Sequence, residues 1–452
     1  MKSSCPRIVV AGAHSGVGKT TVSLALVSAL TERGFRVQAF KVGPDYLDPT
    51  YLSIASGRPC FNLDGWMTDR DYVRELFVKA TADTDIAVVE GVMGLFDGAD
   101  ADTLAGSTAE TAIWLEAPVI LVVNAHGLAR SIAPLVKGFA EFDPRVRVAG
   151  VIANHTGSER HGEGLADALA ASGLPELLGA VTRGAFPTLP DRHLGLVTAD
   201  RSIVSGDMLA ALAEAFERHA SMDKIVEKAR AAPSLDVNIP EASGSSTTER
   251  VRIGLAFDEA FHFYYPDNLL ALEAFGCEVV RFSPLNDRAL PRGLDGMYLG
   301  GGYPEEYAGS LAANRTMIAS IRRFAETGKP VYGECGGLMY LSRGIETLDG
   351  IRHELVGLLP AWTRMLDRLK SLGYVEATLV EDSLFGLKGA RLRGHEFHYS
   401  ELLNDPTEDP LWCPVYSTRR RRSEETIPEG FQSGRILVSY VHMHFASRPE
   451  AV

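Results

Sequence analysis

The sequence has few cysteines and no long apolar run. Its five cysteines are an odd number and include no C-x-x-C pair, so we predict neither a disulfide framework nor a zinc cluster, and we expect a reducing compartment. No apolar stretch approaches the roughly 20 residues that a membrane-spanning helix requires. These absences together predict a cytoplasmic protein without a membrane segment.

Positive charge is also in short supply. Lys and Arg number 45 against 58 Asp and Glu, which gives a formal net charge of -13. Proteins that bind nucleic acids in general usually present a basic face, so we expect small-molecule partners and no nucleic acid. The one basic run, residues 419–422, is flanked by Ser and Thr. It indicates a solvated loop, and contact with an anionic substrate is the alternative.

The length and the apolar patterning predict two α/β domains. The chain has 452 residues, 46% of them hydrophobic, which is too long for one ordinary domain. In residues 1–230, short β-branched runs alternate with amphipathic stretches, as in a doubly wound parallel sheet covered by helices on both faces. Residues 231–249 are rich in Pro, Ser and small polar residues and predict a linker. A second alternation of this kind occupies residues 250–452.

Residues 7–30, "RIVVAGAHSGVGKTTVSLALVSAL", predict a strand, a Gly-rich turn and a helix, which is the context of a phosphate-binding loop. In such a loop Lys19 would reach the β- and γ-phosphates and the Thr20 hydroxyl would ligate Mg²⁺. Ala13 stands where the usual motif has its first Gly, and a fortuitous Gly-rich turn is the alternative. We assign nucleotide binding to Gly12, Ser15, Gly16, Val17, Gly18, Lys19 and Thr20.

Acidic residues follow the second and third predicted strands, in "FKVGPDYLDPTY" and "VVEGVMGLFDG". Ligands of open α/β sheets bind at these carboxyl ends. Acidic side chains beside a triphosphate would repel it without a cation, so ATP with Mg²⁺ is expected. A helix cap is the alternative for Asp48 and Asp97, whereas capping does not favour Glu90. The assignments are substrate binding for Lys41, Asp45 and Asp48, metal binding for Thr20, Asp45 and Glu90, and catalysis for Asp97.

The segment "KPVYGECGGLMYLS" predicts a buried strand, a sharp turn with Cys335 at its tip, and a helix that opens with two glycines. This is the pattern of a nucleophile elbow, in which the helix N-terminus stabilises a thiolate. A buried structural cysteine is the alternative. The pattern therefore favours acyl-transfer chemistry on Cys335.

A thiolate nucleophile needs a base and an oxyanion hole. The segment "SYVHMHF" offers His442 and His444, which as residues i and i+2 of one strand would point to the same face. The backbone N–H groups of Gly301, Gly302 and Tyr303, in "LGGGYPEE", would supply the oxyanion hole. A histidine pair packed in the core is the alternative, although buried imidazoles need polar partners.

Each half resembles a known family. The longer G-x5-G-K-T spacing of the loop resembles dethiobiotin synthetase, which activates a carboxylate with ATP. That resemblance implies that Thr20 and Glu90 ligate Mg²⁺ and that Asn154 reads the adenine edge; an ordinary turn residue is the alternative for Asn154. The second half resembles triad-type, class I glutamine amidotransferases, which carry a Glu two places after the histidine. His444 stands there in this chain, so we assign proton transfer to His442 and orientation of its ring to His444.

Distinctive segments lie along the whole chain: "AGAHSGVGKTTV", "FKVGPDYLDP", "VVEGVMGLFDG", "RHLGL", "GGGYPEEYA", "GECGGLMYL", "GHEFHYSEL" and "SYVHMHFAS". Together they resemble one family that joins these halves, the cobyrinate a,c-diamide synthases. The resemblance implies ATP- and glutamine-dependent amidation of the a and c acetate groups of cobyrinate through acyl phosphates, in cobalamin biosynthesis. Its implied partners are L-glutamine, ATP, Mg²⁺ and a tetrapyrrole polycarboxylate, and it leaves a homodimer open.

Two alternatives remain at this point. The same reaction on hydrogenobyrinate or nickel sirohydrochlorin fits the motifs equally well. A protein of another class, a switch ATPase resembling MinD and ParA with a degenerate amidotransferase domain, would also carry a phosphate-binding loop. Such switches usually place a lysine early in that loop, where this chain has Ala13-His14-Ser15. The intact Cys335 elbow also disfavours degeneracy.

Overall fold

The computed structural model describes residues 2–189, 191–192, 195–196, 204–238, 250–421 and 423–449. The chain divides into two compact units, Met1–Glu241 and Ala242–Val452. This division falls inside the predicted linker, most of which, residues 239–249, lies outside the described residues. Residues 231–238 are not linker but part of the first unit, since strand β11 (Leu235–Asp236) pairs with β1 (Lys2–Ser3) and Leu235 is buried.

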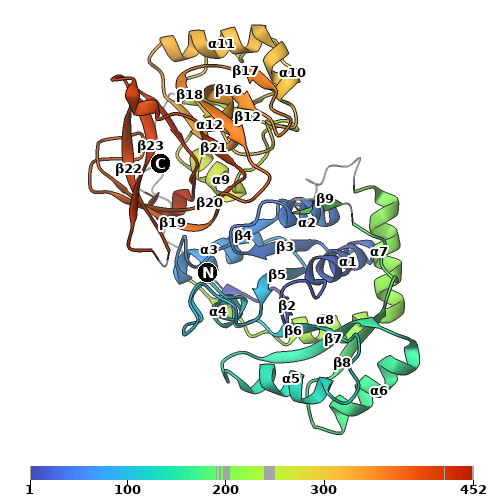
Figure 1. Cartoon of the computed structure of the whole chain (residues 1–452). Coiled ribbons are helices and arrows are strands. Elements are labelled where there is room, and N and C mark those ends of the chain that lie inside the picture. Colours follow the sequence, from blue (N-terminus) through green and yellow to red (C-terminus); the bar gives the residue numbers. More distant parts are fainter. Residues whose placement is uncertain are drawn as a thin grey trace. The chain divides into compact units, whose positions relative to one another are not determined.

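The first unit contains a parallel sheet of seven strands in the order β4-β3-β5-β2-β6-β7-β8 (Figure 1). Every neighbouring pair in it is parallel. The carboxyl ends of the strands therefore meet at one edge, where ligands of such sheets bind. The strands are β2 (Arg7–Gly12), β3 (Val37–Val42), β4 (Phe61–Leu63), β5 (Ile86–Gly94), β6 (Val119–Asn124), β7 (Val148–Thr156) and β8 (Leu177–Thr182).

Helices cover both faces of this sheet. One face carries α1 (Lys19–Glu32), α2 (Asp48–Ser56), α7 (Gly206–His219) and α8 (Met222–Arg230). The other carries α3 (Arg70–Ala80), α4 (Thr108–Trp114), α5 (Ile132–Glu141) and α6 (Glu159–Ala170). A short pair, β9 (Asp191–Arg192) and β10 (Gly195–Leu196), contains part of the "RHLGL" segment, whose side chains lie outside the described residues.

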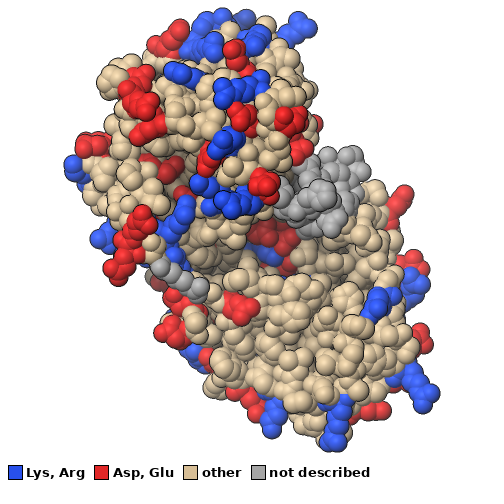
Figure 2. Space-filling view, viewed as in Figure 1, with Lys and Arg blue, Asp and Glu red and all other residues tan. Residues whose placement is uncertain are grey.

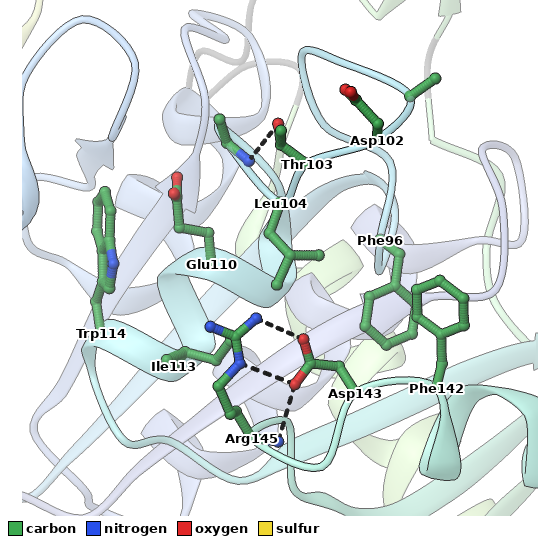
Figure 3. A pocket seen from close by; sticks show the side chains of 12 residues that line it. Phe96, Asp102, Thr103, Leu104, Glu110, Ile113, Trp114, Phe142, Asp143 and Arg145 are labelled. Carbon is green, nitrogen blue, oxygen red and sulfur yellow. Dashed lines mark hydrogen bonds and ion pairs between the residues drawn. The ribbon is translucent and has the colours of Figure 1, made fainter.

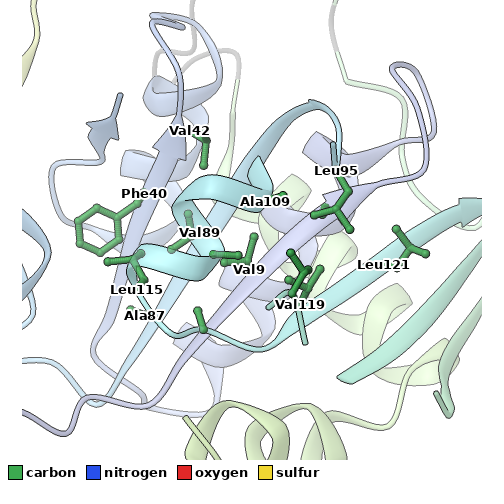
Figure 4. Packing of buried hydrophobic residues seen from close by; sticks show 14 of the residues in the cluster. Val9, Phe40, Val42, Ala87, Val89, Leu95, Ala109, Leu115, Val119 and Leu121 are labelled. Atoms are coloured by element: carbon green, nitrogen blue, oxygen red, sulfur yellow. The ribbon is translucent and has the colours of Figure 1, made fainter. Parts of the chain in front are cut away.

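Successive side chains along each strand point to opposite faces of the sheet, which divides the core of this unit into two layers. In β2, Val9 and Ala11 pack against α3–α6, whereas Ile8 and Val10 pack against the helices of the other face. Figure 4 shows Val9 among residues of the first layer, such as Phe40, Val89 and Val119. Because both faces of each strand are buried, the strands are almost wholly apolar, as the parallel-sheet prediction required.

The second unit contains a mixed ten-stranded sheet in the order β13-β12-β14-β15-β24-β23-β22-β19-β20-β25. The pairs from β13 to β24 are parallel and the remainder antiparallel. The strands in chain order are β12 (Arg252–Ala256), β13 (Glu278–Phe282), β14 (Gly296–Leu299), β15 (Val331–Glu334), β19 (Ser371–Leu379), β20 (Arg391–His398), β22 (Cys413–Arg420), β23 (Thr426–Ser433), β24 (Ile436–Ser439) and β25 (His442–Met443).

A smaller four-stranded sheet and short helices complete the second unit. The sheet has the order β17-β16-β18-β21, with β16 (Ser342–Glu346), β17 (Arg352–Glu354), β18 (Leu359–Met365) and β21 (Ser400–Leu402). The helices are α9 (Pro266–Ala274), α10 (Ala308–Ala313), α11 (Arg315–Glu326) and α12 (Gly336–Leu341), with 3-10 turns η1 (Pro406–Glu408) and η2 (Phe445–Ser447). The two units together confirm the predicted α/β fold class.

The basic run is not the solvated loop that its sequence indicated. Arg419 and Arg420 end strand β22, where a nitrogen of Arg419 lies 3.2 Å from Glu376 and one of Arg420 lies 3.1 Å from Glu396. Arg422 lies outside the described residues. Figure 2 shows side chains of both charge signs interspersed on the face in view of each unit. In the part of the chain that the structure describes, no helix is long and apolar enough to cross a membrane.

Candidate functional site

The turn between β2 and α1 has the backbone of a phosphate-binding loop. Gly16 and Gly18 have φ angles of 79° and 92°, which L side chains rarely adopt. An ideal Cβ on Gly18 would also lie 2.3 Å from Nδ2 of Asn154, and one on Gly12 would lie 2.9 Å from Cδ of Lys19. Gly18 is therefore required by contacts as well as by backbone shape, Gly12 by contacts, and Gly16 by backbone shape. Lys19 begins α1 directly after Gly18 and is buried.

Asn154 lies next to this loop, at the end of β7. Its Nδ2 donates to the Val17 carbonyl at 2.9 Å, and its Oδ1 accepts from the His155 N–H at 3.0 Å. The side chain thus holds the loop in place and also lines a pocket of about 510 Å³ beside it. The pocket is lined by Gly18, Thr20, Thr21, Asn154, His155, Thr182, Arg183, Gly184, Phe186, Pro187, Thr188 and Leu189.

An ion cluster lies at the carboxyl ends of β3 and β5. These strands are neighbours, and Lys41 is paired in register with Glu90. The Lys41 ammonium donates to Asp48 Oδ2 at 2.5 Å and to Glu90 Oε1 at 2.9 Å. The Thr20 hydroxyl donates to the same Glu90 oxygen at 2.8 Å. The structure thus brings together four residues that the sequence assigned to substrate or metal.

Burial dominates the electrostatics of this cluster. It raises the pKa of Glu90 and that of Asp45 to about 7 in each case. Burial alone would lower the pKa of Lys41, but the carboxylates of Asp48 and Glu90 outweigh it and raise that pKa. Burial, followed by the charge of Lys41, lowers the pKa of Lys19. Burial disfavours the ionised form of these carboxyl groups, so neighbouring cations are needed to keep them charged.

The oxygens of this cluster fit a Mg²⁺ ion that is also held by phosphates. Glu90 Oε2 is buried and makes no hydrogen bond to a described residue, and the Thr20 hydroxyl lies beside the other oxygen of the same carboxylate. Within the described ranges, no group of three or more His, Cys, Asp and Glu residues is placed to hold a metal ion by itself. Mg²⁺ commonly binds through one or two carboxylates and the oxygens of a nucleotide, so the donor set is compatible.

Asp45 and Asp97 have structural contacts that their sequence assignments did not foresee. Asp45 Oδ1 accepts from the N–H groups of Leu47 and Asp48 at 2.7 and 3.3 Å, in the turn that precedes α2. Asp97 is exposed and its Oδ2 accepts from the Gly94 N–H at 2.8 Å, which closes a turn. A helix cap was the alternative for Asp48 and Asp97, but Asp48 is the first residue of α2 and contacts Lys41, and the Asp97 contact lies within a turn.

A second pocket, of about 740 Å³, lies between the segment after β5 and the end of α5 (Figure 3). Its aromatic wall includes Phe96, Trp114 and Phe142, and its one arginine, Arg145, is paired with Asp143 at 2.6 Å. None of the residues assigned from the sequence lines it. The remaining lining residues are Ala101, Asp102, Thr103, Leu104, Ala105, Glu110 and Ile113.

In the second unit, Cys335 occupies a strained turn between β15 and α12. Its φ of 47° and ψ of -100° are unusual for a residue with a side chain. An ideal Cβ on Gly337 would lie 2.1 Å from the Leu299 carbonyl oxygen, so the helix can approach β14 only with glycine there. The thiol is buried and lies 3.7 Å from the Phe397 carbonyl oxygen. This is the geometry of a nucleophile elbow.

His442 lies against this elbow. Its ring interacts with the side chains of Cys335 and Glu334, and its Nδ1 lies 3.8 Å from Glu334 Oε2. Burial would lower the pKa of His442, but the Cys335 and Glu334 interactions outweigh burial and raise it to about 10. An ideal Cβ on Gly301 would lie 2.4 Å from Cε1 of this ring, which explains the glycine.

His444 has different neighbours from those predicted. Its Nε2 lies 3.1 Å from Asp267 Oδ2, and its ring centroid lies 5.1 Å from that of Tyr265. Strand β25 ends at Met443, so the alternation that would place both histidines on one face does not extend to His444. The contacts of His444 therefore do not support its role in orienting His442.

The Gly-rich segment after β14 packs on the elbow, but one of its three predicted donors is engaged elsewhere. The Tyr303 N–H donates to the Ala260 carbonyl at 3.0 Å, which removes it from the predicted oxyanion hole. An ideal Cβ on Gly336 would lie 3.1 Å from the Gly302 nitrogen, so these two backbones are in contact. Gly336 follows the nucleophile, and the N–H at that position of an elbow commonly serves the oxyanion hole. Sequence reasoning missed Gly336, although the elbow pattern contained the signal.

Strand β20, with the motif "GHEFHYSEL", was also left without a role. His395 lies with its ring centroid 6.3 Å from that of His442, and burial lowers the His395 pKa to about 3. Phe397 supplies the carbonyl beside Cys335. Pairing of β20 with β25 helps to bring this motif to the elbow, and a local sequence pattern does not indicate such a pairing.

The comparisons with known proteins agree with both halves of this description. Residues 8–196 match the CobQ/CobB/MinD/ParA nucleotide binding domain, and residues 252–450 match the CobB/CobQ-like glutamine amidotransferase domain. Together with the phosphate-binding loop and the cysteine elbow, these matches define the chain as an amide-forming ligase with a nucleotide-binding unit and a glutamine amidotransferase unit.

Full-length relatives identify the family. The chain is 57% identical to the cobyrinate a,c-diamide synthase of Syntrophotalea carbinolica, with 99% of this chain and 97% of the relative covered. It is 44% identical to that of Leptospira interrogans, with 99% and 97% covered, and 41% identical to that of Salmonella typhimurium, with 98% and 95% covered. The chain belongs to the cobyrinate a,c-diamide synthase family. This sets aside the switch ATPase and confirms an enzyme of cobalamin biosynthesis.

Proposed function

We propose that the protein converts cobyrinate to its a,c-diamide with ATP and glutamine. The observation that carries the proposal is that one chain of this family contains both kinds of site. One unit has a cysteine elbow, and the other has a phosphate-binding loop beside a buried carboxylate cluster. The two sites answer two separate needs. A carboxylate must be activated before it accepts nitrogen, and the nitrogen must be released from glutamine.

The first unit would activate the carboxylate. An acetate oxygen of the substrate attacks the γ-phosphorus of ATP, the bond to the bridging oxygen breaks, and an acyl phosphate and ADP result. Lys19 and the N–H groups of the loop balance the phosphate charge. Thr20 and Glu90 would hold Mg²⁺, which when bound neutralises charge on the phosphates. Asn154 positions the loop and borders the pocket in which we place the adenine.

The second unit would release the ammonia. The thiol proton of Cys335 passes to His442, and the sulfur attacks the side-chain amide carbon of glutamine. The carbon–nitrogen bond then breaks, the nitrogen takes the proton from His442, and ammonia leaves. Water hydrolyses the resulting thioester to glutamate and restores the thiol. Ammonia attacks the acyl phosphate to give the amide and phosphate, and a second cycle gives the diamide.

The substrate is identified by comparing amide formation on three tetrapyrroles. The purified protein is supplied with ATP, Mg²⁺ and glutamine and offered cobyrinate, hydrogenobyrinate or nickel sirohydrochlorin, and mass spectrometry counts the amides formed. We expect two amides on cobyrinate, because the relatives above carry that substrate in their names. Amide formation on one of the other tetrapyrroles, without any on cobyrinate, would reject this assignment in favour of that substrate.

A further inference from the structure

Glu334, which directly precedes the nucleophile, lies at the centre of a buried polar network. It is 1% exposed. Its Oε1 accepts from the Tyr332 hydroxyl at 2.6 Å and from the Met443 N–H at 3.0 Å, and its Oε2 accepts from the Tyr298 hydroxyl at 2.7 Å. The same Oε2 lies 3.8 Å from His442 Nδ1. Its donors hold the carboxylate so that one oxygen faces the histidine.

We propose that Glu334 is the positioning carboxylate of the glutaminase site and orients His442 through Nδ1. This inference rests on the proposed glutaminase step. A positioning carboxylate keeps the proton on Nδ1, so that Nε2 is free to take the thiol proton, and it stabilises the imidazolium that forms. Nε2 lies 3.3 Å from where a Cβ on Gly301 would be, on the side of the Gly-rich segment that packs on the elbow.

The residue at the usual place for this carboxylate does not compete for the role. His444 stands two places after His442, and its Nε2 is at ion-pair distance from Asp267. The triad carboxylate would then come from the strand before the nucleophile instead of the strand that carries the base. This exchange is geometrically available because β15 and β24 are adjacent and parallel, and the chain after β24 returns past Glu334 at Met443.

Among the described residues, the histidines and tyrosines around His442 and Glu334 do not supply a competing negative charge. Facing His442 are Cys335, Glu334, His395 and His398, and burial lowers the pKa values of His395 and His398, which keeps both rings neutral near pH 7. Near Glu334 are four tyrosines whose pKa values burial raises, so they remain protonated and uncharged: Tyr264, Tyr298, Tyr332 and Tyr416.

The test is Glu334→Gln in the full-length protein. The amide oxygen replaces Oε1 at the Met443 N–H, which leaves the NH₂ group toward His442. That group donates to Nδ1 and places the ring proton on Nε2, the wrong nitrogen for a base. We expect glutamine hydrolysis to fall about 10²- to 10⁴-fold, as when a triad carboxylate becomes an amide. Amidation from high ammonia should persist, because it takes place on the other unit.

A pH profile separates positioning from a purely structural role. Iodoacetamide alkylation of Cys335 is measured from pH 5 to 10, since the thiolate is the reactive form. Loss of a neighbouring carboxylate destabilises the imidazolium that accompanies the thiolate. The rising limb of the alkylation rate plotted against pH should therefore move to higher pH by about one unit or more. Tyr340→Phe, which removes a buried hydroxyl that makes no hydrogen bond to a described residue, is the matched control and should leave the limb near its wild-type position.

Each outcome decides the inference. An alkylation limb of E334Q at the wild-type pH, or a loss of hydrolysis no larger than that of Tyr340→Phe, would overturn it. If circular dichroism shows that E334Q does not fold, Glu334→Asp is used instead, because it keeps the charge but at a greater distance from His442. Its rate of glutamine hydrolysis should lie between that of the wild type and that of the inactive Cys335→Ala variant. Its alkylation limb should shift by less than about one unit. Failure to amidate any tetrapyrrole would reject the proposed function, but it would not alter these glutaminase measurements.

Discussion

At the scale of single residues, the chemistry of the second unit depends on which groups touch the Cys335 thiol and the His442 ring. Cys335 is held at a backbone conformation that costs about 1–3 kcal/mol, which persists only where the surroundings enforce it. His442 is 1% exposed and takes its charge from contact with the thiol and with Glu334.

Cys335→Ala should therefore abolish glutamine-dependent amidation and leave amidation from high ammonia largely intact. In the proposed function the nucleophile serves only the release of ammonia, whereas carboxylate activation belongs to the first unit. Product is counted by mass spectrometry with each nitrogen source, and circular dichroism checks the fold. A folded variant that had also lost ammonia-dependent synthesis would show that the two sites are not separate.

The two histidines should differ in the kind of damage that their loss causes. His442→Asn removes the proton-transfer group and should lower glutamine hydrolysis by about 10²-fold or more. His444→Asn weakens a buried contact with Asp267 and should chiefly lower the free energy of unfolding, by about 1–3 kcal/mol. Hydrolysis rates and thermal unfolding are compared for both variants. A greater loss of hydrolysis in a stably folded His444→Asn protein would reverse these roles.

At the scale of elements, adjacency of strands assembles both sites. In the first unit, β3 and β5 are neighbours, so Lys41 and Glu90 meet across one register pair. In the second, β14 and β15 are neighbours, so the segment after β14 runs beside the elbow after β15. In each case a residue near one strand end contacts a residue far away in the sequence, and glycines set how closely the backbones approach.

Gly301→Ala tests this close approach. The new Cβ would lie 2.4 Å from Cε1 of His442, so the ring must move. Displacement of a catalytic group by about 1 Å can cost roughly 10²-fold, and we expect a loss of glutamine hydrolysis of that order with ammonia-dependent synthesis retained. Gly309→Ala, at a helical position where the nearest atom would be 3.6 Å away, is the matched control. Equal hydrolysis in the two variants would contradict the packing described.

At the scale of the whole molecule, the proposed function divides one reaction between a nucleotide site in the first unit and a glutaminase site in the second. Each unit has its own apolar clusters, and the carboxylate cluster of the first and the elbow of the second contain entirely different residues. This division predicts that damage to the first unit cannot be bypassed by a different nitrogen source.

Lys19→Ala and Glu90→Gln should each remove synthesis from both glutamine and ammonia. Lys19 compensates phosphate charge, and Glu90 would anchor the metal that accompanies ATP. The Cys335 thiol should still react with iodoacetamide in both variants, which serves as the control for the second unit. Wild-type rates of ammonia-dependent amidation in either variant would exclude the proposed role of that residue.

The sequence alone determined the features that depend on local order. The Gly-rich turn before Lys19, the apolar parallel strands and the Cys335 elbow were all predicted, because each is specified by consecutive residues with defined backbone preferences. The tertiary structure decided which distant groups face one another. It placed Asp267 beside His444, Glu334 beside His442, and the Tyr303 N–H on Ala260. It also turned the basic run into the end of a strand and residues 231–238 into part of the first unit. Such pairings follow from the adjacency of strands and from where a strand ends, and residue spacing does not specify either.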